Sequence, residues 1–150
     1  MVLIFYSLIK NFLKYLYSSA PAKIGKKSMA KHHQTGKRGE ALAAGLLREK
    51  GYEILEQNWR FSRAEVDIIA RQNLALIFLE VKTRRSQKFG HPAAFVTPKK
   101  RKFLADAAQE YMRMTGHDWA YRFDIISVIM EPNAPPLIEH FTDAFFPGIR

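Results

Sequence analysis

Two short stretches of this sequence place charged side chains next to apolar runs. In IFLEVKTRR, residues 77–85, Glu80 and Lys82 follow three apolar residues, and in AEVDIIA, residues 64–70, Asp67 lies between apolar neighbours. Carboxylate oxygens are the ligands that Mg²⁺ prefers, and a bound ion of this kind activates water and polarises a phosphate oxygen. These residue types therefore indicate metal-assisted hydrolysis of a phosphate ester, provided that the two stretches lie side by side.

The alternation of side chains along two expected strands brings these residues together. The expected strand 74–83 has one apolar face, formed by Ala75, Ile77, Leu79 and Val81. The expected strand 64–70 has another, formed by Val66, Ile68 and Ala70. Matching the two faces puts Asp67 on the same side of the sheet as Glu80 and Lys82. Asp67 then lies opposite Glu80 or diagonal to it, with roughly 5–8 Å between the Cβ atoms.

This register predicts a site for Mg²⁺ or Mn²⁺. We expect Asp67, Glu80 and the backbone carbonyl of Val81 to hold the ion. Lys82 would orient the attacking water or offset charge in the transition state, rather than act as a general base. The alternative is an exposed sheet edge, where the same side chains form surface ion pairs that contribute little to stability. Spacing alone leaves both interpretations open.

Glu40 is a further candidate catalytic acid, in the expected helix 36–50. It shares a helix face with three apolar residues, Ala43, Ala44 and Leu47. A carboxylate that points towards the core needs a partner. A metal cluster is one candidate partner. The helix N-terminus is the other, since Thr35 is the expected N-cap and Glu40 lies near the expected first turn.

The order of the expected elements sets the fold class. They are a helix at 36–50 that ends at Gly51, strands at 52–61, 64–70 and 74–83, a helix with Thr97 as N-cap, Pro98 at its first position and Gly116 at its end, a strand at 119–130 and a short strand at 137–141. Three strands with short links favour an antiparallel meander, and an intervening helix allows a parallel crossover. The expected fold is α/β, a mixed central sheet flanked by helices in the order α-β-β-β-α-β.

The charge balance favours a polyanionic partner. The chain has 150 residues with 24 Lys and Arg against 14 Asp and Glu, a formal net charge of +10. The absence of cysteine excludes disulfides, thiolate nucleophiles and Cys-ligated zinc, and it fits a cytoplasmic protein. The chain has neither a glycine-rich phosphate loop nor a serine nucleophile elbow.

Basic side chains cluster where a nucleic acid could bind. Lys37 and Arg38 open the first expected helix, Lys99 and Lys100 open the second, and helix N-termini suit phosphates. Two arginines follow the strand that carries Glu80, namely Arg84 and Arg85. The alternative is a solvated helix face. If several of these residues contact phosphates, binding should fall steeply with salt.

The first thirty residues differ from the rest. Residues 1–17 are an apolar run, short for a membrane span and interrupted by Lys10 and Lys14. We expect residues 1–30 to be an extension outside the fold, with Met29 as an alternative start, and residues 31–150 to form one domain. A membrane anchor is the alternative for the extension.

Five segments, in this order, resemble the YraN family of bacterial proteins: GKRGEALA, GYEILEQNWR, AEVDIIA, IFLEVKTR and YRFDIISV. The resemblance covers about residues 35–129. That family has a restriction-endonuclease-like fold with a PD-(D/E)xK motif, similar to archaeal Holliday-junction resolvases. One departure is Ala64, where the family usually has glycine.

The resemblance implies that Glu40, Asp67, Glu80 and Lys82 occupy nuclease positions in a nuclease-like domain, and that Arg122 and Asp124 belong to a late RFD motif. It implies hydrolysis of phosphodiester bonds in DNA by a Mg²⁺- or Mn²⁺-dependent endonuclease, with branched and single-stranded DNA as candidate substrates. Because resolvase-like folds often act as dimers, a homodimer is one possible state of this protein. The alternatives are a non-catalytic DNA-binding module that retains the fold and a membrane-associated scaffold.

Overall fold

A computed structural model describes residues 28–86, 94 and 96–146. The chain divides into two units, 1–31 and 32–150, and the description below concerns the second. The predicted extension lies almost wholly outside the described residues.

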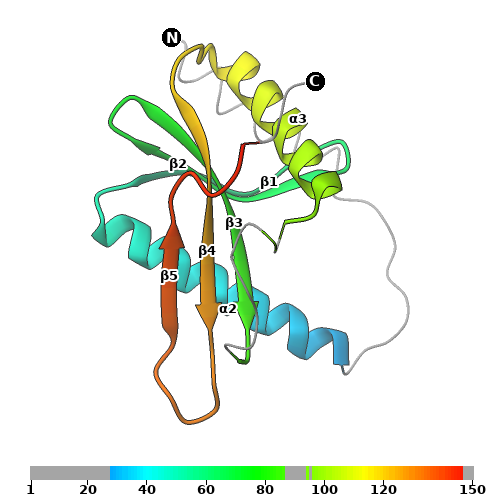
Figure 1. The fold of residues 1–150 in the computed structure, drawn as a ribbon, viewed down its shortest axis with the longest axis vertical. Coiled ribbons are helices and arrows are strands. Elements are labelled where there is room, and N and C mark those ends of the chain that lie inside the picture. Colours follow the sequence, from blue (N-terminus) through cyan, green and yellow to red (C-terminus); the bar gives the residue numbers. More distant parts are fainter. Residues whose placement is uncertain (1–27, 87–93, 95, 147–150) are drawn as a thin grey trace. The chain divides into compact units, whose positions relative to one another are not determined.

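The described elements follow the predicted order. They are α2 (Ser28–Glu49), β1 (Glu53–Phe61), β2 (Ala64–Gln72), β3 (Ala75–Arg84), α3 (Pro98–Thr115), β4 (Tyr121–Ile129) and β5 (Leu137–Phe141). The five strands form one sheet in the order β1-β2-β3-β4-β5, which Figure 1 shows from its broad side. β3 and β4 pair in parallel, and the other neighbours pair antiparallel. The predicted meander, parallel crossover and α/β fold class are confirmed.

The register between β2 and β3 pairs even-numbered residues with odd-numbered ones, as predicted. Ile68 lies opposite Leu79, and Gln72 lies opposite Ala75 at the turn. Continued by one residue beyond Ile68, the same register places Asp67 opposite Glu80.

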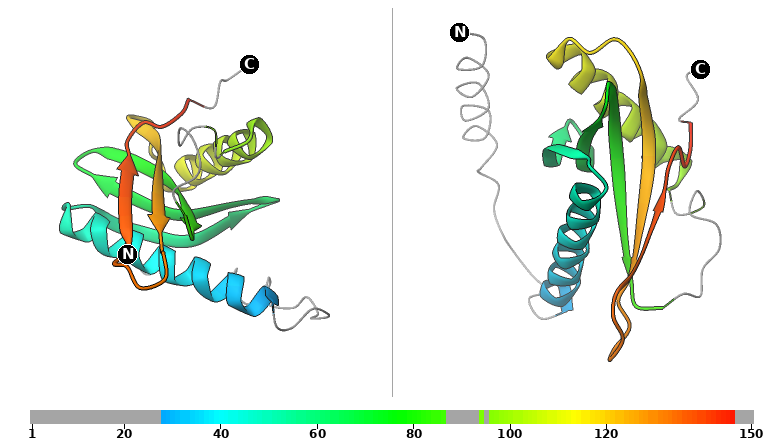
Figure 2. Two further views of the ribbon diagram at one scale, coloured as in Figure 1. Left: turned by 60° about the horizontal axis from the view of Figure 1, so that its bottom comes forward. Right: turned by 90° about the vertical axis from the view of Figure 1, so that its left-hand side faces the viewer.

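Apolar side chains pack on both faces of the sheet. One cluster joins the sheet to α3 and includes Ile69, Phe78, Leu104, Ala107 and Phe123. The other joins it to α2 and includes Ala43, Leu47, Ile68, Ile77 and Leu79. Figure 2, right, shows α2 along one face of β3 and β4. The apolar faces predicted for the two strands are therefore real, with one exception.

That exception is Val66, which packs in the α3 cluster, whereas Ile68 packs in the α2 cluster. The prediction that both share one face is wrong. The partner strand β1 is irregular at Asn58, which has a φ of 53°, a left-handed conformation that interrupts regular pairing. Its neighbours pair with the two residues in question, Gln57 with Ile68 and Trp59 with Val66. The alternation of β2 therefore breaks at the residue between Val66 and Ile68, which is Asp67.

The two helix starts differ in how well the sequence predicts them. Thr97 caps α3, since its hydroxyl oxygen accepts the N–H of Lys100 at 3.2 Å, and Gly116 ends the helix with a φ of 65°. By contrast, α2 begins at Ser28, so Thr35 lies inside it and is not a cap. No glycine or proline separates Ser28 from Thr35, and each further residue of a formed helix adds a hydrogen bond.

Candidate active site

The carboxylate of Asp67 reaches from β2 to the backbone of β3. The backbone ladder between the strands ends at the pair Ile68–Leu79. Beyond it, Oδ2 of Asp67 accepts the N–H of Val81 at 2.7 Å. In a strand the N–H and C=O groups of one residue point to the same side, so the carbonyl of Val81 also faces β2. A carboxylate and a backbone carbonyl of the predicted metal site thus lie on adjoining strands and face each other.

Glu80 is buried, with 5% of its side chain exposed. Its Oε1 accepts a hydrogen bond from Nζ of Lys82 at 2.6 Å. Its Oε2 lies 3.1 Å from Nζ of Lys100 but accepts no hydrogen bond. Glu80 is therefore not a member of a surface ion pair, and it keeps one buried oxygen that is incompletely satisfied.

Burial and mutual repulsion act on the two carboxylates. The pKa of Asp67 is raised from its ordinary value of 3.8 to about 7, chiefly by burial and then by the charges of Glu80 and Glu40. The N–H of Val81 and the charge of Lys100 act in the opposite direction. A carboxylate pair of this kind, with one member buried and one half-buried, is stabilised by a cation between its members. The incompletely satisfied oxygen of Glu80 and the raised pKa of Asp67 both fit a divalent ion at this position.

Glu40 approaches the site from α2. Because that helix begins at Ser28, the helix N-terminus is not its partner, and that alternative is wrong. Nδ2 of Asn58 donates a hydrogen bond to Oε2 of Glu40 at 3.0 Å instead. Within the described ranges, no three acidic or histidine side chains gather closely enough to hold an ion. Glu40 thus acts on Asp67 through its charge and does not complete a three-carboxylate cluster.

A glycine allows α2 to approach the end of β3. Gly39 is buried, and a Cβ atom at this position would lie 1.9 Å from Oγ1 of Thr83. Only a residue without a side chain fits there. The contact between Gly39 and Thr83 holds α2 against β3. It lies next to two predicted site residues, because Glu40 follows Gly39 and Lys82 precedes Thr83.

The predicted phosphate-binding residues separate into two groups. Lys37, Arg38, Arg85 and Lys99 are exposed, whereas Arg84 and Lys100 are half-buried. Lys37 and Arg38 lie well inside α2, so the interpretation that they open a helix and act with its free N–H groups is wrong. Lys100 does lie in the first turn of α3, but its side chain turns inwards to Glu80.

A further cationic group, which no sequence pattern predicts, lies beside the N-terminus of α3. Arg63, in the turn between β1 and β2, lies over the ring of Phe103 at 5.5 Å, and Lys99 lies 5.9 Å from the same ring. The two cations come from separate elements and meet on one aromatic side chain. A basic residue in a two-residue turn carries no signal that predicts such a contact.

The late RFD motif forms a separate polar network. Asp124 is fully buried and accepts hydrogen bonds from Nε of Arg122 at 2.9 Å, from the ring of His140 at 2.8 Å and from the N–H of Asp143 at 2.9 Å. Burial raises the pKa of Asp124, but the hydrogen bonds from His140, Arg122 and Asp143 outweigh it and lower the pKa below its ordinary value.

This network lies on the other face of the sheet from Glu80. Asp124 pairs with Leu79, which faces α2, whereas Glu80 contacts Lys100 of α3. The motif therefore joins β4 to β5 and stays outside the candidate site. The sequence assigned no role to His140, because a histidine in a short edge strand lacks metal-ligand spacing.

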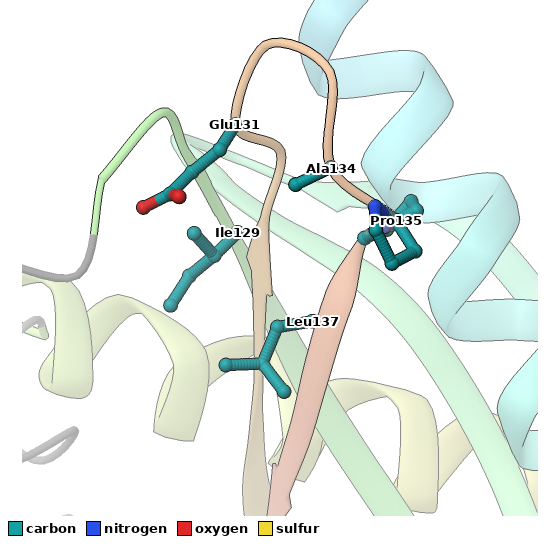
Figure 3. A pocket seen from close by; sticks show the side chains of 6 residues that line it. Ile129, Glu131, Ala134, Pro135 and Leu137 are labelled. Atoms are coloured by element: carbon teal, nitrogen blue, oxygen red, sulfur yellow. The ribbon is translucent and has the colours of Figure 1, made fainter.

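A pocket lies at the far end of the β4–β5 hairpin. Its lining consists of Ile129, Glu131, Ala134, Pro135, Pro136 and Leu137, most of which Figure 3 shows around it. It contains none of the predicted site residues. Within the described part of the chain, neither helix is long and apolar enough to cross a membrane.

Comparisons with known proteins agree with the motifs. The model of the family described as "Uncharacterised protein family UPF0102" matches residues 39–128. The UPF0102 protein of Flavobacterium psychrophilum is 48% identical over 118 residues, which cover 79% of this chain and 98% of the relative. The one from Phocaeicola vulgatus is 42% identical over 121 residues, with 81% and 99% covered. The one from Rhodococcus jostii is 42% identical over 118 residues, with 78% and 100% covered.

The matched region begins at Gly39, contains Asp67 and Glu80, and ends in β4. It therefore includes every carboxylate of the candidate site. The relatives are covered over nearly their whole length, so the similarity is not confined to one motif. The chain belongs to family UPF0102, the YraN family that its motifs resemble.

Proposed function

We propose that this protein is a Mg²⁺- or Mn²⁺-dependent endonuclease-like enzyme that hydrolyses phosphodiester bonds in DNA. The observation that carries the proposal is the carboxylate pair. Asp67 reaches the backbone of Val81 while the adjoining Glu80 is buried with one oxygen lacking a hydrogen bond. Two adjoining acids, one buried and one half-buried, lower stability unless a cation balances them, so a ligand of positive charge explains the arrangement.

The residues of the site have separate roles in this proposal. Asp67, Glu80 and the carbonyl of Val81 would hold the ion. An ion so held supplies a more acidic bound water and a polarised phosphate oxygen. Lys82 has 30% of its side chain exposed, so its ammonium group can turn from Glu80 towards substrate. There it would orient the attacking water or stabilise negative charge on the phosphoryl oxygens.

The exposed cations favour DNA as the substrate. Lys37, Arg38, Arg85 and Lys99 have exposed side chains, and Arg84 is half-buried at the end of β3. Phosphate contacts of this kind make binding dependent on salt and independent of sequence. The resemblance to resolvases suggests branched or single-stranded DNA, and a homodimer acting on it. The lack of cysteine fits activity in the cytoplasm.

A cleavage assay on the full chain tests the proposal. Duplex, single-stranded and branched DNA are incubated with Mg²⁺ or Mn²⁺ and with four proteins: wild type, Asp67→Asn, Glu80→Gln and Asp118→Asn. The last removes one exposed carboxylate from the turn before β4 and serves as the matched control. We expect wild type and Asp118→Asn to cleave and Asp67→Asn to lose activity. Cleavage that persists in both Asp67→Asn and Glu80→Gln would refute the assignment of the site.

One observation favours a second function, a DNA-binding module without catalysis. Lysines face both oxygens of Glu80, at 2.6 Å from Lys82 and 3.1 Å from Lys100, so part of its charge is balanced without a metal. This alternative predicts salt-sensitive DNA binding, no heat of binding with Mn²⁺ and no cleavage. Calorimetry with Mn²⁺ on the DNA-free protein separates the two functions.

A further inference from the structure

The side chain of Lys100 leaves its own helix and joins two strands. Its backbone N–H caps α3 through Thr97, while its Nζ donates a hydrogen bond to the backbone carbonyl of Glu65 at 3.0 Å. The same Nζ lies 3.1 Å from Oε2 of Glu80. Glu65 belongs to β2 and Glu80 to β3, so the ammonium group of Lys100 sits where the two strands that carry the site meet.

Lys100 and Lys82 contact Glu80 in different ways. Lys82 donates a short hydrogen bond to Oε1 from two residues along the same strand. Lys100 faces Oε2, the oxygen that accepts no hydrogen bond, and gives its hydrogen bond to Glu65 instead. The charge of Lys100 also acts on Asp67. Lys100 is therefore a cation that interacts electrostatically with both carboxylates of the candidate metal site.

We propose that Lys100 is a displaceable counter-ion, which balances Asp67 and Glu80 in the metal-free protein and gives up Glu80 when the two carboxylates bind a divalent cation. The inference rests on the proposed metal site but not on cleavage. It assigns Lys100 a positioning role inside the site in place of the outward phosphate contact that its sequence position predicts.

The geometry allows such a displacement. Lys100 is 30% exposed, so water reaches part of its side chain, and its flexible four-carbon stem can turn outwards without movement of α3. An ion pair without a hydrogen bond is weaker than one that has it, so Oε2 of Glu80 is the oxygen more readily released. Once released, the ammonium group stays beside the site.

Metal affinity in the DNA-free protein gives the first test. Calorimetry with Mn²⁺ compares the full-length wild type with Lys100→Met and Lys99→Met. The two variants lose the same charge from adjacent positions, but the ammonium group of Lys99 lies over the ring of Phe103, at 5.9 Å from its centre. Since breaking a partly exposed ion pair costs up to about 1 kcal/mol, Lys100→Met should bind Mn²⁺ about fivefold more tightly than wild type. Lys99→Met should bind as wild type does.

A second variant guards against loss of folding. Lys100→Gln removes the charge but keeps an N–H donor for the carbonyl of Glu65, and it should show the same gain in affinity. Thermal melts with chelator present identify any variant that does not fold.

Chemical labelling gives a readout that is independent of affinity. Lysines of the wild type are acylated briefly with and without Mn²⁺, and each site is quantified by mass spectrometry. Release from Glu80 should raise the labelling of Lys100 severalfold on addition of Mn²⁺, while Lys99 keeps its rate.

The outcomes separate this inference from the proposed function. If the wild type binds Mn²⁺ but Lys100→Met and Lys100→Gln bind it no more tightly, and the labelling of Lys100 is unchanged, Lys100 is not displaced and the metal site stands. If the wild type binds no divalent ion, the metal site is wrong and the displacement falls with it.

Discussion

Replacing Asp67 with asparagine should stabilise the metal-free protein at alkaline pH. The substitution removes the negative charge beside Glu80 and keeps an oxygen that can accept the N–H of Val81, which Asp67 bonds at 2.7 Å. Most substitutions at half-buried polar positions destabilise. A gain in stability is therefore a specific signature of a buried and repelled carboxylate.

The magnitude follows from the pKa of Asp67, which the fold raises from 3.8 to about 7. Because the folded state binds this proton more tightly than the unfolded chain, its contribution is fully present below pH 4 and is lost as the pH rises through 7. At 1.36 kcal/mol for each pH unit, the loss approaches about 4 kcal/mol. Asparagine does not titrate, so Asp67→Asn should match wild type near pH 4 and exceed it at pH 8 by about 2–4 kcal/mol.

Urea unfolding at pH 4 and pH 8 with a chelator present measures the difference. Asp118→Asn removes an exposed carboxylate, so it should show the same change in the free energy of unfolding between pH 4 and pH 8 as the wild type. Added Mg²⁺ should reverse the order at pH 8, because only the wild type gains stability from ion binding. If Asp67→Asn is less stable than wild type at pH 8 without metal, the carboxylate is not destabilised by its surroundings and the reasoning about the site fails.

Three further substitutions test other parts of the structure. Gly39→Ala should lower the free energy of unfolding by roughly 1–3 kcal/mol, because its Cβ would meet Thr83, whereas Gly36→Ala, in open space, should raise it slightly in the same melts. Asp124→Asn should cost about 3 kcal/mol at pH 7 by urea unfolding, and the loss should shrink as the pH falls through the lowered pKa of Asp124. Lys99→Ala should weaken DNA binding and reduce the slope of log affinity against log salt by about 1, measured by fluorescence anisotropy.

The periodicity of the sequence predicts the sheet well because both faces are covered. Ile77 and Leu79 pack towards α2, while Leu76 and Phe78 pack towards α3, so a slip of one residue would exchange two buried sets. The caps of α3 were equally predictable, since Thr97, Pro98 and Gly116 each have a local conformational reason. The start of α2 was not, because helix propagation towards Ser28 needs no particular residue.

The proximity of Asp67, Glu80 and Lys82 was predictable, but the contacts that they make were not. The alternation of side chains predicts that Asp67, Glu80 and Lys82 lie close together, and they do so in the structure. Alternation also placed Val66 with Ile68, and the irregularity opposite Asn58 breaks that rule at Asp67. A left-handed asparagine inside a strand leaves no periodic signal, so the turn of the Asp67 carboxylate into the plane of the sheet could not be predicted.

The burial of Glu80 argues against the exposed sheet edge, one of the two interpretations that spacing left open. An exposed ion pair contributes up to about 1 kcal/mol and needs no particular environment, whereas a buried carboxylate lowers stability unless its charge is well balanced. Lys82 and Lys100 are each 30% exposed and leave Oε2 of Glu80 without a hydrogen bond, so the balance they provide is incomplete. Apolar side chains at Asp67 and Glu80 would remove that cost, because the surrounding strands already carry two apolar clusters. Acids at these two positions are therefore better explained by a ligand that they bind than by the stability of the sheet.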